Sequence, residues 1–434
     1  MELAFYWAGV LVVAVLVLVR PYIGLLALSF MLPLEESFLG VQQRGVTVTR
    51  YLGLFVITAW AFSKIRVRRM PYYETSMQWG ILLLCWAGLS TVWSVYRDVS
   101  VSSLTTLVQL GGLAMLTADL ASSPRRVAGL LGTFLAGCLA LSLLGLFVPS
   151  LRAGGPLMTL ENTGAKWFSF CAGAVVLAGL VLLGSRGIPR WLSRTAIAAV
   201  GGNVLAVVLA GERGTFVALA LTLVVLGLIE GGRMRAVCLL VAAVAVVGIT
   251  SSFLAERAGL PSDIAGRYRV EEMARTGGTG RTRIWGNALA LFMRSPLVGS
   301  GLSTFHEPDP YRDPRFMSAH NDLLGIAVDL GVVGALLYLA LMGGAIVRPL
   351  SVRSRMKASQ SRVLPLVVSA LIMYLVGSGL TSRFFYAKAF WLLLGLSYAV
   401  TRVPGSATEH GSAAVSSEPP TPRSAHSSSE EWRQ

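Results

Sequence analysis

Long apolar stretches alternate with short polar connections along almost the whole chain. A helix needs about 20 apolar residues to cross the hydrocarbon core of a bilayer. On this criterion the sequence predicts spans at 3–19, 22–39, 47–63, 77–94, 100–120, 127–148, 164–184, 192–210, 214–230, 235–253, 320–347, 361–380 and 384–401. Because only Arg20 and Pro21 separate the first two, these can form one broken or re-entrant element. We therefore predict an all-α polytopic membrane protein with 12 or 13 transmembrane helices.

The basic residues of the connections are distributed unevenly and predict the orientation of the spans. One alternating set of connections, beginning with residues 64–69, carries sixteen Lys and Arg, whereas the short connections between them carry six. Cytoplasmic loops of membrane proteins are enriched in Lys and Arg. The first set is therefore predicted to be cytoplasmic and the second external.

Two segments fall outside the apolar pattern. Residues 254–319 form the only long connection, which lies on the predicted external side and contains nine Arg and no Lys. Within this loop, residues 281–294 have the pattern of an amphipathic helix that lies on the membrane surface. Residues 402–434 are rich in Ser, Pro and Glu, which is typical of a disordered tail, here cytoplasmic. The predicted division is an N-terminal transmembrane bundle, a large external loop, three C-terminal transmembrane helices and the tail, at residues 1–253, 254–319, 320–401 and 402–434.

Composition supports a membrane protein and argues against nucleic acid as a partner. The chain is 54% hydrophobic and 14% charged, whereas soluble domains carry about 25% charged residues. These values exclude an ordinary soluble protein, a disordered chain and a secreted disulfide scaffold. The formal net charge of +15 would suggest nucleic acid in a soluble protein. Here no basic domain stands apart from the apolar spans, so we expect no nucleic-acid binding.

Three polar positions at the predicted external face are the candidates for chemistry, because burying charge in lipid is expensive. They are Glu212 to Gly214 between two spans, Gly280 to Trp285 at the start of the amphipathic helix, and Ser318 to Asp322 at the start of the eleventh span. All three face the same side in the predicted topology. They can therefore contribute to one site.

The residue types suggest a site that holds an anion and contains a base. The guanidinium fork of Arg matches phosphate oxygens in pairs, so Arg213 and Arg281 can clamp a pyrophosphate. Of the four His in the chain, two lie in the tail, which leaves His306 and His320 on the external side. A neutral imidazole can accept a proton near neutral pH. His320 is therefore the candidate base.

Each of these features also has a structural explanation, which the residues alone leave open. Arg213 can be a basic residue that anchors the span at the interface. Arg281 and Arg283 can form the solvated face of the amphipathic helix. Residues 320–322 can be a capped helix start. Residues 306–310, His-Glu-Pro-Asp-Pro, can bind a metal ion, but the two prolines favour a turn.

Taken in order, the three blocks resemble the O-antigen ligase/polymerase superfamily of bacterial membrane glycosyltransferases. The first block is Glu212-Arg213-Gly214-Thr215 before an apolar run. The second is Gly280-Arg281 with Trp285 four residues after the Arg, followed by a Ser-Pro-Leu-Val-Gly-Ser-Gly stretch at 295–301. The third is Ala319-His320-Asn321 followed by Asp-Leu-Gly-Val-Val-Gly at 329–334. The resemblance covers about residues 212–334, and the order of the blocks is that of the family.

The resemblance implies a GT-C-like fold and transfer of a glycan from undecaprenyl diphosphate to an acceptor hydroxyl. The partners would be the undecaprenyl-diphosphate-linked glycan, a glycan or lipid acceptor, and the bilayer of the bacterial inner membrane, with the active site at the periplasmic or external side and no cofactor or metal. Carried over by block, Arg213 and Arg281 would bind the diphosphate and His320 would be the catalytic base. Arg283 would be an additional substrate-binding Arg outside the motif position, and Asn321 would orient His320 or the sugar.

Several functions stay open at this level. Members of the superfamily include O-antigen ligases, surface-polysaccharide polymerases and protein O-oligosaccharyltransferases, which differ in the acceptor. Glu161 and Asn162 in the external loop 149–163 can line the substrate pocket. A lipid-linked glycan flippase is a different class of protein, for which internal repeats and broken helices near the midplane are typical. The sequence has no evident repeat, and its polar positions lie at one face.

Overall fold

A computed structural model describes residues 15–35, 48–68, 70–147, 165–184, 189–210, 212–229, 281–306, 320–355, 358–380 and 385–402, together with eight residues between 232 and 242. Within these ranges the chain is helical and contains no strand. The prediction of an all-α protein is confirmed. The predicted tail, beyond residue 402, lies outside the described part.

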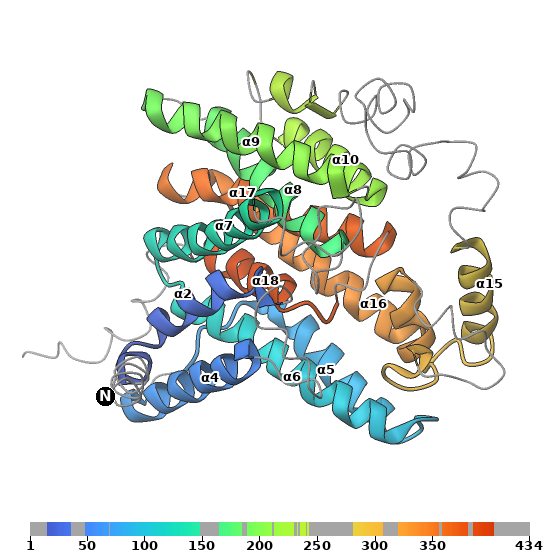
Figure 1. The fold of residues 1–434 in the computed structure, drawn as a ribbon. Coiled ribbons are helices and arrows are strands. Elements are labelled where there is room, and N and C mark those ends of the chain that lie inside the picture. The colour runs from blue at the N-terminus through green and yellow to red at the C-terminus, as the bar shows by residue number, and fades with distance from the viewer. Residues whose placement is uncertain are drawn as a thin grey trace, which may run out of the picture. The chain divides into compact units, whose positions relative to one another are not determined.

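The described helices follow the predicted spans closely (Figure 1). Their bounds are α2 (Pro21–Met31), α4 (Val48–Val67), α5 (Gln78–Ser90), α6 (Arg97–Leu120), α7 (Pro124–Phe147), α8 (Ala165–Gly184), α9 (Arg190–Ala210), α10 (Arg213–Ile229), α15 (Arg281–Phe292), α16 (Asp322–Ser351), α17 (Ala358–Leu380) and α18 (Lys388–Val400). The helix expected at 281–294 is α15. Most of the span expected at 235–253 lies outside the described residues.

The described helices confirm a multi-pass membrane protein. Four of them are long and apolar enough to cross a bilayer by length and composition, namely Arg97–Leu120, Pro124–Phe147, Arg190–Val208 and Asp322–Ser351. Five further apolar helices in the described part are shorter. At Arg20 the backbone is non-helical, with φ −135° and ψ 79°, so the chain breaks at the expected place before α2. Whether the protein has 12 or 13 spans stays a prediction.

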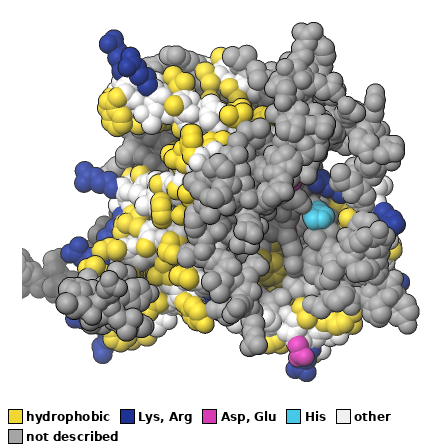
Figure 2. Space-filling model, in the orientation of Figure 1, with side chains coloured by type: hydrophobic (Ala, Val, Ile, Leu, Met, Phe, Trp, Pro, Cys, Tyr) yellow, Lys and Arg dark blue, Asp and Glu magenta, His cyan; other side chains and the backbone are white. Residues whose placement is uncertain are grey.

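Helix α18 lies at the centre of the packing. Every residue from Ala389 to Val400 is buried, and α18 contacts α6, α7, α16 and α17. The outer helices instead expose large apolar side chains such as Phe62, Phe147 and Leu205. In Figure 2, hydrophobic side chains cover much of the coloured surface, and Lys and Arg side chains lie towards the edges of the molecule. A surface of this kind suits contact with lipid.

The connections predicted to be cytoplasmic meet at one face of the bundle. The carboxylate of Asp119, at the end of α6, accepts hydrogen bonds from Trp60 Nε1 and from the backbone N–H of Tyr72, both at 2.8 Å, and pairs with Lys64 Nζ at 2.6 Å. Arg402, just after α18, donates to the Asp119 carbonyl at 3.3 Å. The ends of α4, α6 and α18 therefore lie together, as the alternating topology requires.

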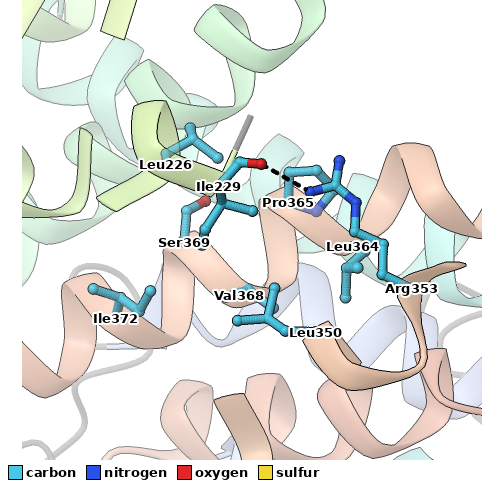
Figure 3. Close-up of a pocket in the computed structure, with 9 residues that line it drawn as sticks. All are labelled: Leu226, Ile229, Leu350, Arg353, Leu364, Pro365, Val368, Ser369 and Ile372. Atoms are coloured by element: carbon cyan, nitrogen blue, oxygen red, sulfur yellow. Dashed lines mark hydrogen bonds between the residues drawn. The ribbon is translucent and has the colours of Figure 1, made fainter. Parts of the chain in front are cut away.

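Two further contacts extend this face to α10 and α16. Arg348 pairs with Glu74 at 2.9 Å. Arg353 donates to the carbonyl of Ile229, the last residue of α10, at 3.3 Å (Figure 3). The small cavity beside Arg353 measures about 10 Å³, which is room for one water molecule and not for a substrate.

Tyr72 connects the segment before α5 to the end of α18 at the same face. Its ring lies under the guanidinium of Arg402, 4.3 Å from the ring centroid, and its hydroxyl is 3.5 Å from Thr401 Oγ1. Burial raises the pKa of the Tyr72 phenol above its ordinary value, so the hydroxyl stays protonated at neutral pH. Its contact with Arg402 is consequently that of a neutral ring with a cation.

Substitution of Asp119 by Ala is expected to destabilise the protein by about 3 kcal/mol, because it leaves Lys64 without its partner and two N–H donors without an acceptor. The side chain of Asp119 is only 3% exposed, whereas Arg348 in the neighbouring ion pair is 49% exposed. Arg348→Gln is therefore the matched control, with an expected loss of at most about 1 kcal/mol. Thermal unfolding of the purified protein measures both. Equal losses of stability in the two variants would contradict the larger contribution assigned to the buried pair of Asp119 and Lys64.

Candidate functional site

Helix α16 is broken at Gly331, and a loop of the second sequence block is inserted at the break. Gly331 has φ 69° and ψ −172°. The carbonyls of Val328 and Asp329 accept hydrogen bonds from the N–H groups of Ser300 and Gly301 at 3.0 and 2.9 Å. A helix that ends within a membrane protein needs other donors for its last carbonyls, and here the loop at 295–305 supplies them.

Two more hydrogen bonds stabilise the backbone on either side of the break. The indole of Trp86 in α5 donates to the carbonyl of Leu330 at 2.9 Å. The N–H of Val332, the first residue beyond the break, donates to the carbonyl of Pro296 at 2.8 Å. The broken helix is therefore held by protein groups on both sides of Gly331.

Glycine is required where the two backbones meet. A Cβ atom on Gly331 would lie 2.1 Å from the Leu297 carbonyl oxygen, and a Cβ on Gly299 would lie 2.3 Å from that of Asp329. Both glycines have positive φ, 69° and 71°. These glycines belong to the second and third sequence blocks. The two blocks are thus joined directly in the fold.

The carboxylate of Asp329 fixes the same loop from within α16. One carboxylate oxygen accepts the N–H of Ser303 at 3.0 Å, and the other accepts the N–H of Phe305 at 2.9 Å and the hydroxyl of Thr304 at 3.3 Å. Asp329 is only 6% exposed. The carboxylate thus binds three successive residues of the loop, so Asp329 serves to position it.

The loop is also tied to the α5–α6 hairpin and to the segment before α18. Ser100 donates to the carbonyl of Leu302 at 2.7 Å, and the N–H of Leu302 donates to Ser90 Oγ at 3.2 Å. The hydroxyl of Ser303 lies 2.8 Å from that of Tyr386. Contacts from α5, α6, α16 and the segment before α18 therefore make this loop a rigid part of the described fold.

His320 and Asn321 stand at the start of α16. The side chain of Asn321 caps the helix by accepting the N–H of Leu324 at 3.0 Å. Asp322, 4% exposed, accepts the N–H of Phe385 at 2.8 Å and so joins the helix start to the segment before α18. Asn321 thus has the structural role of a helix cap. Its contact with a substrate stays a prediction.

His320 is half-buried and has a left-handed backbone, with φ 48°. This conformation is uncommon for residues other than glycine, although His adopts it more readily than most. Backbone conformations of this kind concentrate at functional sites. The capped start of α16, locked by Asp322, fixes the backbone from which the imidazole projects.

Helix α15 places Arg281 and Arg283 on different faces. Arg281 is half-buried and lies on the same helix face as Ala288, which is fully buried, while Arg283 points to the exposed face. Ala288 packs with Phe305 and Val328, so the Arg281 face of α15 is the one directed at α16 (Figure 1). The helix period thus separates two arginines that stand two positions apart in the sequence.

Arg213 is the first residue of α10, and its side chain lies outside the described part. The turn that it begins is nevertheless well packed. Thr215 is 1% exposed, and a Cβ on Gly173 of α8 would be 3.7 Å from its methyl group and 2.3 Å from Met373 of α17. The start of α10 therefore packs against α8 and α17.

The three sequence blocks are connected through α16 and α17. Helix α15 contacts α16 directly, and α17 contacts both α10 and α16. Phe385, in the segment that follows α17, is bound by Asp322 at the start of α16. His320 and Arg281 thus lie on neighbouring elements, and the element of Arg213 is joined to them by α17.

Some residues of the predicted site lie outside the part that the structure describes. Glu161, Asn162 and residues 307–310 lie outside the described residues, as does the side chain of His306. In the part that the structure describes, no group of three or more His, Cys, Asp or Glu could hold a metal ion. The hypothesis of a metal site at 306–310 therefore stays untested.

Sequence reasoning placed Asp322 and Asp329 in or beside the third block but assigned neither of them, nor Tyr386, a role in holding this region together. Both aspartates lie within the span predicted at 320–347. A charged residue inside an apolar span is expensive and is usually functional or paired, so this criterion could have singled out Asp329. Tyr386 carried no such mark in the sequence.

A comparison with protein families finds a match to part of the chain. Residues 197–339 match the family model described as O-antigen ligase, about a third of the chain. The matched range contains all three blocks, so the resemblance to the O-antigen ligase superfamily is confirmed. This family supports a glycan-transferring membrane enzyme. A comparison with curated proteins gives no match.

Proposed function

We propose that the protein transfers a glycan from an undecaprenyl-diphosphate-linked donor to the hydroxyl of a glycan or lipid acceptor. The main support is the packing of α15, which carries Arg281, against α16, whose locked start carries His320. The site would lie at the periplasmic or external face of a bacterial inner membrane, and the tail in the cytoplasm. A GT-C-like architecture is part of the same proposal.

In this mechanism the two arginines stabilise the leaving group. Arg213 and Arg281 bind the diphosphate and neutralise the negative charge that develops as the bond between the anomeric carbon and the oxygen breaks. Two guanidinium groups supply positive charge without a metal ion. The imidazole of His320 takes the proton of the acceptor hydroxyl, which attacks from the opposite face and inverts the anomeric centre.

A lipid-linked glycan flippase is the main alternative function. The break in α16 is relevant to it, because broken helices are typical of transporters. Broken helices of transporters direct their unpaired backbone groups at a substrate or an ion. Here the carbonyls of residues 328–330 accept hydrogen bonds from Ser300, Gly301 and Trp86. The break is thus used to anchor a loop. This observation favours an enzyme over a transporter.

Substitution of Arg281 by Lys is expected to lower the rate of transfer by about 10- to 100-fold, because an ammonium cannot reproduce the paired contacts of the guanidinium with a diphosphate. Arg283→Lys, two residues away on the exposed face of the same helix, is the matched control and should change the rate by less than about threefold. Single-turnover assays with a lipid-linked donor measure both rates. Equal effects would contradict the assignment of Arg281 over Arg283.

Purified protein in vesicles tests the proposal as a whole. With a polyprenyl-diphosphate-linked oligosaccharide and a candidate acceptor, transfer should release polyprenyl diphosphate and lengthen the acceptor. Movement of the labelled lipid across the bilayer without transfer would instead establish a flippase. In cells, deletion of the gene separates two forms of the proposal: lipid-linked polymer accumulates if the enzyme is a ligase, and single repeat units remain if it is a polymerase. A protein O-oligosaccharyltransferase would instead leave a glycoprotein without its glycan.

A further inference from the structure

Asp322 and Asp329 lie on the same face of α16. Positions seven residues apart differ by only about 20° around a helix and by about 10 Å along it. Both side chains are buried, with 4% and 6% of each residue exposed. Each carboxylate holds a different segment, because Asp322 accepts the N–H of Phe385 and Asp329 accepts the N–H of Ser303. Two parts of the chain that are distant in sequence are therefore held on one face of α16.

The hydroxyl of Tyr386 joins these two segments to each other. It lies 2.8 Å from the hydroxyl of Ser303, and Tyr386 directly follows Phe385 in the chain. The two segments and α16 thus form a closed ring, whose members in order are Asp322, Phe385, Tyr386, Ser303 and Asp329. Removal of the phenol oxygen alone would open this ring.

Phe385 is held from two further sides. Its carbonyl accepts a hydrogen bond from the indole of Trp391 in α18 at 2.7 Å, and its ring packs edge-on against Tyr338 of α16, with 5.6 Å between the ring centroids. Tyr338 lies beyond the break in α16, whereas Asp322 lies before it. Phe385 therefore contacts both parts of the broken helix, and the side chain of Tyr386 starts from a fixed backbone.

Two residues with a left-handed backbone lie in or beside the ring. Within the described residues, a positive φ outside glycine occurs at Arg68, Ser303 and His320, with values of 51°, 62° and 48°. Ser303 is a member of the ring, and His320 precedes Asp322 by two positions. Such conformations cost free energy and persist only where the surrounding contacts determine them. The ring supplies contacts of this kind at Ser303 and at the helix start that follows His320.

We propose that Tyr386 is a positioning residue for the candidate base, an inference that rests on the proposed function. The bonds at the break hold the loop at 295–305 to residues 328–332 of α16. The bond of Tyr386 adds a connection from this loop to the segment that Asp322 fixes at the start of the helix. This second connection fixes the helix start, which carries His320, relative to the loop that follows α15, which carries Arg281.

Tyr386→Phe removes only the phenol oxygen and tests this role. We expect kcat of transfer to fall about tenfold, because catalysis is sensitive to small displacements of a reacting group, whereas KM for the lipid-linked donor stays unchanged. Tyr22→Phe is the matched control. Its hydroxyl donates to the carbonyl of Arg126 at 2.8 Å, at the predicted cytoplasmic face, and its loss should leave kcat unchanged.

A second comparison tests whether Tyr386 acts through the imidazole. Residues that act as a unit have non-additive effects on rate. In the His320→Asn background, Tyr386→Phe should therefore lower the residual rate no further. A further tenfold loss in that background would show a role independent of His320 and would overturn the proposal.

A spectroscopic test separates this proposal from the proposed function. The chain has four His, and the imidazole signal of His320 in protein labelled with [¹³C]histidine is identified by its loss in His320→Asn. We expect this signal to shift in Tyr386→Phe and in Ser303→Ala, which removes the other hydroxyl of the pair, but not in Tyr22→Phe. If Tyr386→Phe does not fold, Ser303→Ala decides both the kinetic and the spectroscopic test.

The outcomes are distinct. A His320 signal that does not move, or a kcat equal to that of Tyr22→Phe, overturns the role of Tyr386. A wild-type protein that transfers no glycan, but whose His320 signal still responds to Tyr386→Phe, would instead reject the proposed function, while the control of the His320 environment by Tyr386 would stand.

Discussion

Substitution of His320 by Asn is expected to lower glycan transfer by about 10²- to 10⁴-fold, the contribution of a positioned general base. Asparagine is chosen because His320 has a left-handed backbone with φ 48°, which Asn tolerates better than Ala does. The substitution therefore removes the imidazole and keeps a residue type that suits this backbone conformation. Transfer from a lipid-linked donor, measured at saturating donor and acceptor, gives the effect.

Stability and donor binding distinguish loss of the base from loss of the fold. His320→Asn should unfold at the same temperature as the wild type and should bind the lipid-linked donor with unchanged affinity, because the diphosphate is assigned to Arg213 and Arg281. Normal transfer by a stable variant would remove His320 from the mechanism. A variant that unfolds early would show that the imidazole has a structural role.

The spans were predictable because their apolar pattern follows directly from the requirements of the bilayer. The break within α16 was not predictable, because the apolar pattern continues on both sides of Asp329 and Gly331 and neither residue by itself indicates an interrupted helix. The break depends on the loop at 295–305, which lies more than twenty residues earlier in the chain. Such a contact between distant backbones leaves no periodic trace in the sequence.

The candidate site was likewise predictable from the sequence only in part. Helical periodicity alone separates Arg281 from Arg283, once the bounds of α15 are known. By contrast, the bond from Asp322 to the N–H of Phe385 and the contact between Ser303 and Tyr386 join residues more than sixty positions apart. Residue types and order predicted the candidate chemistry, whereas the residues that hold it in place required the structure.

Substitution of Gly331 by Ala is expected to release the loop from α16 and to abolish transfer. A backbone with φ 69° and ψ −172° is essentially restricted to glycine, and the strain of another residue costs about 1–3 kcal/mol. In addition, the new Cβ would lie 2.1 Å from the Leu297 carbonyl oxygen, so the hydrogen bonds that join the two sequence blocks cannot be kept. Limited proteolysis between residues 295 and 305 reports release of the loop.

Gly325→Ala in the same helix is the matched control. Gly325 is helical and buried, and a Cβ there meets nothing within 4 Å. Because Ala is the better helix former, this substitution should be neutral or should stabilise the protein by up to about 1 kcal/mol. Equal protease resistance and equal transfer in the two variants would mean that the loop does not depend on the break in α16. A loss confined to Gly331→Ala would show that transfer depends on the joining of these two backbones.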